Sequence, residues 1–242
     1  MQFQIVGHAC LSVEAAGTRL VIDPWIQGSL YWGSWWHWPD PVFGPELLEP
    51  DFIYLTHWHF DHFHADSLRL FDKRAHVLVP RFPVSFLASQ LRALGFNRIT
   101  ELRQAERYEL AAGFTLTSYQ VRHEDDSVAV VDADGACLVD LNDAKPMPST
   151  WKLLRTRHPR VDFMLRSHSP AWSYPTFYSF EDRTDAIELS GRSYVQSFIA
   201  AARMLRPRHA VPSRQQQFAV GDRPTVDFLV VPRLGQIEGR ER

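Results

Sequence analysis

The residues best suited to chemistry lie close together in the first third of the chain. Four metal-ligand types fall within six positions, His57, His59, Asp61 and His62, directly after the apolar run 52–56. If the chain leaves a buried strand there still extended, His57 and His59 point the same way and can hold one ion. Asp61 and His62 follow as the chain turns and can face a second ion. Imidazole and carboxylate donors at this density indicate a site for zinc, iron or manganese.

The elements around this cluster are predicted from apolar patterning and turn residues. The chain twice shows a series of expected strands followed by a helix, and this order indicates two packed sheets with helices outside. Expected strands are 2–6, 10–14, 18–23, 52–56, 76–80, 114–121, 127–131, 136–141, 161–166, 208–212 and 225–231, and expected helices are 64–71, 84–94, 150–157 and 192–205.

A long segment, 24–50, is rich in Pro, Gly and Trp and has neither helical nor strand periodicity. Long loops of this kind in compact proteins are commonly functional. Because it precedes the histidine cluster, Trp32, Trp35 and Trp36 are candidates for an apolar wall that binds substrate. The alternatives are a small satellite core or a subunit interface that would make a homo-oligomer.

Composition sets the class of protein. The chain has 242 residues, a formal net charge of −2 and two cysteines, Cys10 and Cys137. A net charge so close to zero does not indicate binding to nucleic acid, which favours an excess of basic residues. Two cysteines are too few for a disulfide framework. No apolar run is long enough to span a membrane and the start shows no secretory signal, so a cytoplasmic protein is expected. We expect one domain over 1–236, with 237–242 resembling the remnant of a protease site.

Residues 56–62 carry the HxHxDH signature of the metallo-β-lactamase superfamily, which the chain resembles from about residue 5 to 215. The segments 7–11 and 21–25 look like the opening of the branch with ascorbate-phosphate lactonases and N-acyl-phosphatidylethanolamine phospholipase D. The segments 125–127, 141–143 and 169–175 are similar to the hydrolase-like domain of cytidine-monophosphate N-acetylneuraminate hydroxylase.

The resemblance implies an α/β fold, the αββα sandwich of two mainly antiparallel or mixed sheets with helices outside, and a site at one edge of the sheets. It implies two divalent ions, zinc being favoured over iron or manganese. It also implies a ligand set, which is His57, His59 and His123 for the first ion, Asp61 and His62 for the second, and Asp143 as the bridge between them.

Two of these assignments have competitors nearby. Asp140 competes with Asp143 for the bridging role, although Asp143 lies past the predicted strand end, as a residue at the sheet edge should. Glu124 competes with His123. Asp23 matches an aspartate that supports ligand histidines in the family, and His8 is a candidate for the same supporting role.

The sequence departs from the family near residue 214. Arg214 stands where the family has its last metal-binding histidine, and His209 lies on the wrong side of the predicted strand to replace it. His168 follows another strand and is the better candidate for a ligand or catalytic residue. Arg214 is instead expected to bind an anionic group of the substrate or to pair with a carboxylate of the protein, and Tyr174 is a further substrate-binding candidate.

Two kinds of chemistry fit this set of residues. In the leading interpretation, a metal-activated hydroxide, with Asp61 and His168 as catalytic residues, hydrolyses a small ester, lactone, amide or phosphoester. The alternative is a di-iron or mixed-metal oxygenase. A Rieske iron–sulfur centre would need Cys and His pairs, which two isolated cysteines cannot supply, so a partner would have to deliver electrons. A metal-binding scaffold without catalysis is the third and weakest interpretation.

Overall fold

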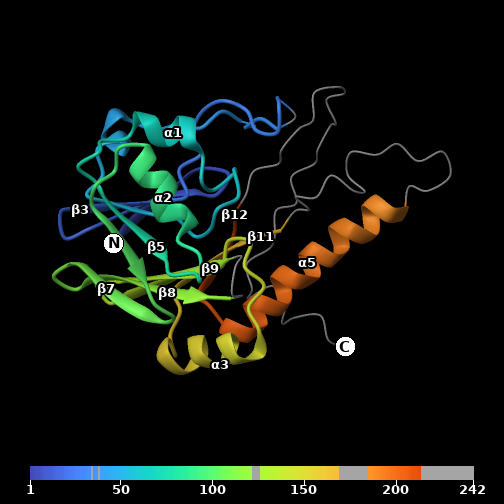
Figure 1. Cartoon of the computed structure of the whole chain (residues 1–242). Coiled ribbons are helices and arrows are strands. Elements are labelled where there is room, and N and C mark those ends of the chain that lie inside the picture. Colours follow the sequence, from blue (N-terminus) through green and yellow to red (C-terminus); the bar gives the residue numbers. More distant parts are fainter. Residues whose placement is uncertain (34, 38, 122–125, 169–184, 214–242) are drawn as a thin grey trace, which may run out of the picture.

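The chain forms two six-stranded sheets packed face to face with helices on both outer sides (Figure 1). The computed structural model describes residues 1–33, 35–37, 39–121, 126–168 and 185–213, with the backbone alone for 185–191. The predicted αββα architecture of two mixed sheets is therefore confirmed.

The first sheet contains the strands that precede and follow the histidine cluster. Its β1–β2–β3 part is antiparallel, and β3–β4–β5–β6 is parallel. Since the carboxyl ends of parallel strands share one edge, the segments that follow β3 and β4 lie side by side there. The strands are β1 (Gln2–Gly7), β2 (Cys10–Ala15), β3 (Thr18–Ile22), β4 (Phe52–Tyr54), β5 (His76–Pro80) and β6 (Ile99–Leu102).

The second sheet has the order β12–β11–β10–β9–β8–β7, with parallel pairing only at β10–β11–β12 among its described strands. Its strands are β7 (Glu106–Ala111), β8 (Phe114–Gln120), β9 (Ser127–Ala133), β10 (Ala136–Asp140), β11 (Phe163–Ser167) and β12 (His209–Ser213).

Helices cover the outer face of each sheet (Figure 1). The first sheet carries α1 (Ala65–Leu70) and α2 (Phe86–Ala93), and the second carries α3 (Pro148–Arg157) and α5 (Asp185–Leu205). Leu68 and Leu91 pack on the first sheet's outer face, and Leu154 and Phe198 pack on the second sheet's. A third apolar cluster fills the space between the sheets, so each sheet is buried on both sides.

Tyr54 links the two sheets by hydrogen bonds within this central layer. Its phenol oxygen lies 2.7 Å from Ser118 Oγ and 2.8 Å from Ser127 Oγ, and its side chain is fully buried. The Ser127 hydroxyl also donates to the carbonyl of Thr56, at 2.8 Å. The start of β9 is thereby fixed against the chain that leaves β4.

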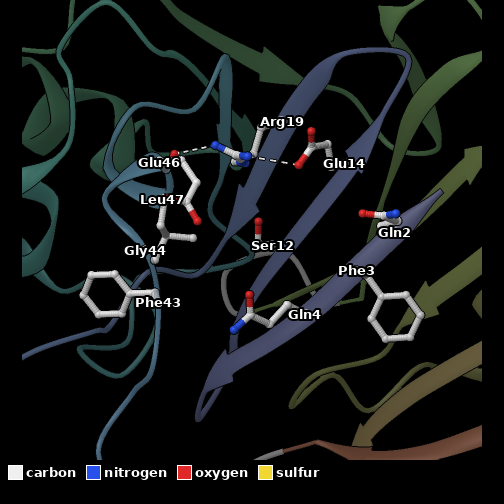
Figure 2. Close-up of a pocket in the computed structure, with 10 residues that line it drawn as sticks. All are labelled: Gln2, Phe3, Gln4, Ser12, Glu14, Arg19, Phe43, Gly44, Glu46 and Leu47. Carbon is white, nitrogen blue, oxygen red and sulfur yellow. Dashed lines mark hydrogen bonds and ion pairs between the residues drawn. The ribbon is translucent and has the colours of Figure 1, made fainter.

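The long loop after β3 is held at both ends. A short 3₁₀ helix, η1 (Pro45–Leu48), returns the chain to the first sheet, where Arg19 donates to the carbonyl of Glu46 at 2.6 Å and to the Glu14 carboxylate at 3.0 Å. Figure 2 shows these contacts at the rim of a small surface hollow of about 160 Å³. Since protein groups engage the Arg19 guanidinium on two sides, these contacts tie the end of the loop to the first sheet.

The middle of the loop builds a satellite core around the fully buried Trp25. Leu30 and Trp35 pack against it, and the His37 ring contacts it at a tilt of 38°, with the ring centroids 3.9 Å apart. Burial, with further contributions from His8 and His64, lowers the pKa of His37 to about 3. His37 is therefore held in its neutral form.

The predicted elements match the observed ones with small shifts at the ends, and a few differ more. Two strands, β6 and β7, were not predicted, and α5 begins seven residues before the predicted start at 192. The strand β6 has only four residues, and β7 mixes charged residues with few apolar ones, so the periodicity of both strands is weak. The strand expected over 225–231 and the segment 237–242 lie outside the described residues. Among the described helices, none combines the length and hydropathy of a membrane span.

Replacing Tyr54 with Phe should destabilise the fold. Two buried serine hydroxyls lose a partner, and the expected loss in the free energy of unfolding is about 1–3 kcal/mol. Urea denaturation measures it. Tyr108→Phe is the matched control, because that half-buried hydroxyl makes one long contact, 3.4 Å to His76, and its change should stay within about 0.5 kcal/mol. Equal losses in the two variants would contradict the linking role of Tyr54.

His37 should make the metal-free protein acid-sensitive. The folded state keeps the ring neutral down to about pH 3, whereas the unfolded chain takes up the proton below about pH 6.5. Stability is therefore lost as the pH falls through this window. Between pH 7 and 4.5 the wild type should lose about 1–3 kcal/mol more than His37→Gln, measured by urea denaturation in the presence of a chelator. Parallel pH profiles would show that His37 does not contribute.

Candidate metal centre

The histidine cluster follows β4 at the edge where the first sheet meets the second. The chain continues extended past Tyr54, with Leu55 N–H donating to the carbonyl of Leu78 at 3.2 Å. It then turns, as the amides of His62 and Phe63 both donate to the carbonyl of His59. Because α1 begins soon after, at Ala65, all four ligand-type side chains lie on one short segment between two regular elements.

The side chains of His57 and His59 lie next to each other before the turn begins. His57 Nε2 lies 2.9 Å from His59 Nδ1, and the His57 ring is buried. This is the arrangement expected from side-chain alternation along an extended chain. The lone pairs of two imidazoles can therefore reach one ion.

Asp61, His62 and Asp143 form the other half of the cluster. His62 Nε2 lies 3.4 Å from Asp61 Oδ2 and 3.6 Å from Asp143 Oδ2. One ligand atom from each of His57, His62 and Asp143 falls within 4.8 Å of the others. Since Asp143 follows β10 of the second sheet, the two sheets each contribute to this group.

A buried carboxylate, Asp23, holds the group together. It accepts hydrogen bonds from the Thr56 amide at 2.8 Å and the Thr56 hydroxyl at 2.6 Å, and it lies 2.8 Å from His62 Nδ1. The side-chain amide of Asn142 donates to the same carboxylate. Asp23 thus sets the orientation of the His62 ring, the supporting role that the resemblance implied.

His8 supports Asp61 from the turn between β1 and β2. Its Nε2 lies 3.0 Å from Asp61 Oδ2, and its ring is buried. The ligand atoms of His8, Asp61 and His62 also lie within 4.8 Å of one another. His8 can therefore either orient Asp61 or be a ligand itself.

Three residues at this centre adopt left-handed backbone conformations. The φ angles are 48° for His8, 47° for Asp23 and 47° for Asn142. Non-glycine residues rarely adopt such angles, which carry a conformational cost and concentrate at functional sites. The fold therefore holds three side chains of the centre in place at some expense of stability.

The centre has an excess of buried carboxylates. Burial, reinforced by Asp143, raises the pKa of Asp126 well above its usual range, and burial with Asp23 raises that of Asp140 to about 7. Burial alone would lower the pKa of His62, but Asp61 and Asp23 raise it well above its usual value. Such a cluster favours added positive charge, which a divalent cation would supply.

The two competing aspartates lie in different surroundings. Asp143 approaches His62, whereas Asp140 is buried at the end of β10, where its Oδ1 accepts a hydrogen bond from the backbone N–H of Asn142 at 3.0 Å. Asp140 belongs to no group of three converging ligand atoms among the described residues. Its position is that of a residue shaping the turn that carries Asn142 and Asp143.

Two polar residues of the centre were not singled out from the sequence. Asp126 precedes β9 and places a carboxylate oxygen 3.5 Å from His57 Nδ1. The Asn142 side chain contacts Asp23 and lies 3.1 Å from His62 Nδ1. The one sequence signal that could have indicated Asn142 was its position directly before Asp143, after a predicted strand.

Other predicted site residues are less central or cannot be placed. His168 follows β11 and is half-buried, but it joins no converging ligand group within the described part of the chain. His209 begins β12 and is exposed. Outside the described residues lie His123, Glu124, Tyr174 and Arg214.

The tryptophans of the long loop divide between two roles. Trp35 is buried in the satellite core, so it supports the loop and is not available as a substrate wall. Trp32 is fully exposed and Trp36 about half exposed. Tyr31 connects this loop to the metal-binding segment through an edge contact with Phe60, with ring centroids 5.9 Å apart.

An apolar hollow that the sequence did not indicate adjoins the metal-binding segment. Trp58 and the chain between β5 and α2 form it, with a volume of about 380 Å³. Trp58 contacts the His59 ring on one side and Phe86 on the other, at centroid distances of 4.8 and 6.3 Å. Phe82 and Val84 also line the hollow.

Comparison with known proteins places the chain in a family. The sequence pattern described as a β-lactamase superfamily domain matches residues 2–140, more than half of the chain. The chain belongs to the metallo-β-lactamase superfamily. This superfamily comprises metal-dependent enzymes, and its fold implies binding of divalent metal ions.

Two curated relatives carry names linked to oxidation. A Mycobacterium tuberculosis (strain H37Rv) protein named as a Rieske 2Fe-2S iron–sulfur protein is 31% identical over 194 residues, which cover 76% of this chain and 37% of the relative. The mouse cytidine monophosphate-N-acetylneuraminic acid hydroxylase is 32% identical over 76 residues, 31% of this chain and 13% of the hydroxylase. The present chain thus spans well under half of the length of these two relatives.

Two solved structures share the fold. An isothiocyanate hydrolase from Delia radicum gut bacteria aligns with a TM-score of 0.65 and 18% identity, covering 88% of this chain and 84% of its own. The di-iron β-hydroxylase CmlA from Streptomyces venezuelae aligns with a TM-score of 0.57 and 18% identity, covering 86% and 43%. The fold of the present chain therefore occurs both in a protein named as a hydrolase and in one named as a hydroxylase.

Asp23→Asn should weaken metal binding without removing a proposed ligand. The new amide places a donor among groups that donate to Asp23, so the His62 ring loses its fixed orientation. Changes of this type lower metal affinity by about 10- to 100-fold. Zinc titration against a chromophoric chelator measures the affinity. The control is Asp51→Asn, at an exposed carboxylate that binds the Arg19 amide; a similar loss in both variants would contradict a specific role for Asp23.

Proposed function

We propose that this chain is a metal-dependent hydrolase whose centre holds two divalent ions, with zinc as the expected metal. The observation that carries the proposal is the convergence of ligand atoms from His57, His62 and Asp143 within 4.8 Å. All of these atoms are nitrogen or oxygen, which is the donor chemistry that zinc, iron and manganese accept.

The described residues suggest how the ligands divide. His57 and His59 would hold the first ion, Asp61 and His62 the second, and Asp143 lies where it can contact both. We further propose His8 for the position that the family fills with its last histidine, since His8, Asp61 and His62 already form a converging group. When bound, such ions lower the pKa of a water molecule and polarise the bond to be cleaved.

The protein's own groups would then position and exchange protons. Asp61 Oδ2 lies between His8 Nε2 and His62 Nε2, where its carboxylate can accept a proton from an attacking water. Asp23 keeps His62 oriented, and Asp126 faces the far nitrogen of His57. No serine or cysteine nucleophile is required by this scheme.

We propose that the substrate carries an apolar group that enters the hollow beside Trp58. Trp58 lies between the two histidines of the first pair in sequence, and its ring contacts His59. A hollow of about 380 Å³ accommodates a small acyl chain or ring. This supports a small, partly apolar ester, lactone, amide or phosphoester as the substrate class.

Oxidation by a di-iron centre is the second candidate. It is favoured by one observation, namely that two relatives above 30% identity carry the names of a Rieske protein and a hydroxylase. The two cysteines of this sequence cannot form a Rieske centre, so the electrons would have to come from outside it.

Metal analysis combined with turnover separates the two candidates. Protein from unsupplemented cells should contain about two zinc ions per chain and hydrolyse some members of a panel of esters, lactones, amides and phosphoesters. Iron together with an oxo-bridge absorption, and no hydrolysis, would replace the hydrolase proposal with the oxygenase. Protein that binds no metal at all would overturn both.

Asp143→Asn and Asp140→Asn form a matched pair for the bridging role. The first should reduce occupancy of both ions together, with an affinity loss at least as large as the roughly 10- to 100-fold known for supporting residues. The second should leave metal content unchanged, since asparagine imitates the protonated carboxyl that burial favours at Asp140. Inductively coupled plasma measurement of metal per chain decides it, and loss of both ions only in Asp140→Asn would reverse the assignment.

A further inference from the structure

A second group of metal-ligand types lies at the opposite end of the second sheet. The centre described above involves Asp126 and Asn142, at the start of β9 and past the end of β10. Asp132 and Cys137 lie at the other ends of the same two strands, next to the connecting turn. The two groups are therefore separated by the length of the strands.

The strand register brings two of these side chains together. Cys137 pairs directly with Asp132 across the antiparallel β9–β10 ladder, so both side chains project from the same face. That face is the outer one, where Cys137 packs among the side chains beneath α3 and α5. Cys137 is buried, and Asp132 is partly exposed.

His158 completes the group from the end of α3. It occupies the C-cap position, and its Nδ1 lies 3.9 Å from Cys137 Sγ and 3.6 Å from Asp132 Oδ2. One ligand atom from each of the three residues falls within 4.8 Å of the other two. Ligand atoms around a single tetrahedral ion with bonds of about 2.0–2.3 Å lie at comparable separations.

Tyr119 orients the histidine from the neighbouring strand β8. Its phenol oxygen lies 2.7 Å from His158 Nε2. In the tautomer in which Nε2–H donates to this oxygen, the lone pair of Nδ1 faces the thiol and the carboxylate. A hydrogen bond to the far ring nitrogen is the usual support of a metal-binding histidine.

A hollow of about 530 Å³ opens beside the three residues and leaves room for a further ligand. Arg107, Arg157 and Arg160 line it and would oppose an uncompensated cation. A thiolate and a carboxylate supply two negative charges, which balance those of a divalent ion. The guanidinium groups would then favour water or a small anion at the remaining coordination position.

We propose that Asp132, Cys137 and His158 form a second, mononuclear metal site for zinc or an ion of similar preference. Sulfur, nitrogen and oxygen donors together suit zinc and exclude magnesium and calcium, which take oxygen ligands. The three donor atoms converge on one point and a hollow opens beside them, which is the geometry that a metal site requires.

Cobalt titration of the full chain tests this site without reference to activity. Thiolate ligation to Co²⁺ gives a near-ultraviolet charge-transfer band, and nitrogen and oxygen ligands do not. With only two cysteines in the chain, such a band must come from Cys10 or Cys137. We expect the band to reach the amplitude of one thiolate-bound Co²⁺ per chain, although the two-ion centre also takes up cobalt during the titration, and to disappear when zinc is added. Absence of the band in the wild type would overturn the proposal.

Variants assign the band to a residue. Cys137→Ser should abolish it, whereas Cys10→Ala, at a cysteine in the core of the first sheet, should keep it. Tyr119→Phe should retain the band but weaken cobalt affinity by about 10- to 100-fold. A band that survives Cys137→Ser would overturn the proposal. So would rapid alkylation of Cys137 that zinc does not slow, because it would identify a reactive thiol instead.

Discussion

The candidate metal centre depends on one buried carboxylate. Asp23 is inaccessible to solvent and contacts groups from two other segments: Thr56 and His62 between β4 and α1, and Asn142 after β10. A charge in such a place is costly unless it is fully hydrogen-bonded, and here each contact group is a donor. The carboxylate therefore fixes the relative position of the two sheet edges as well as the ring of His62. Few other arrangements of the chain could satisfy it.

The same requirement explains the strained backbone around it. Asp23 and Asn142 leave their strands through left-handed conformations, which turn both side chains back toward the edge shared by the sheets. An extended residue at either place would carry its side chain away from that edge. The conformational cost is met by the large apolar layers on both faces of each sheet. Tyr54, between Ser118 and Ser127, limits sliding of one sheet over the other at the same level.

Much of the fold could be predicted because the sequence carries strong local signals. The four ligand-type residues from His57 to His62 are spaced so that few structures other than a strand–turn–helix junction would use them. Apolar strands such as β5 were recognisable, whereas β7 has charged residues at an exposed edge and gives little periodicity. The supporting roles of Asp23 and His8 came from family resemblance, and the observed contacts are consistent with them.

What sequence alone could not give were contacts between distant segments. The hydrogen bond from Asn142 to Asp23 joins residues 119 positions apart, and no local pattern encodes it. The burial of Trp35 in a satellite core was equally hidden, because a Trp-rich loop suits a binding wall and a small core alike. The hollow beside Trp58 depends on how the chain before α2 packs, which again is decided by tertiary structure.

The assembly of the centre from both sheets has a consequence for folding. Asp61 and His62 belong to the first sheet's edge and Asp143 to the second's, so neither half alone presents the whole ligand group. A metal ion that binds this group favours the packed state over any state with separated sheets. By mass action, an ion at a hundred times its dissociation constant would add about 2.7 kcal/mol to the stability of the folded chain. The availability of metal in the cell would then set how much of the protein stays folded, independently of any reaction it catalyses.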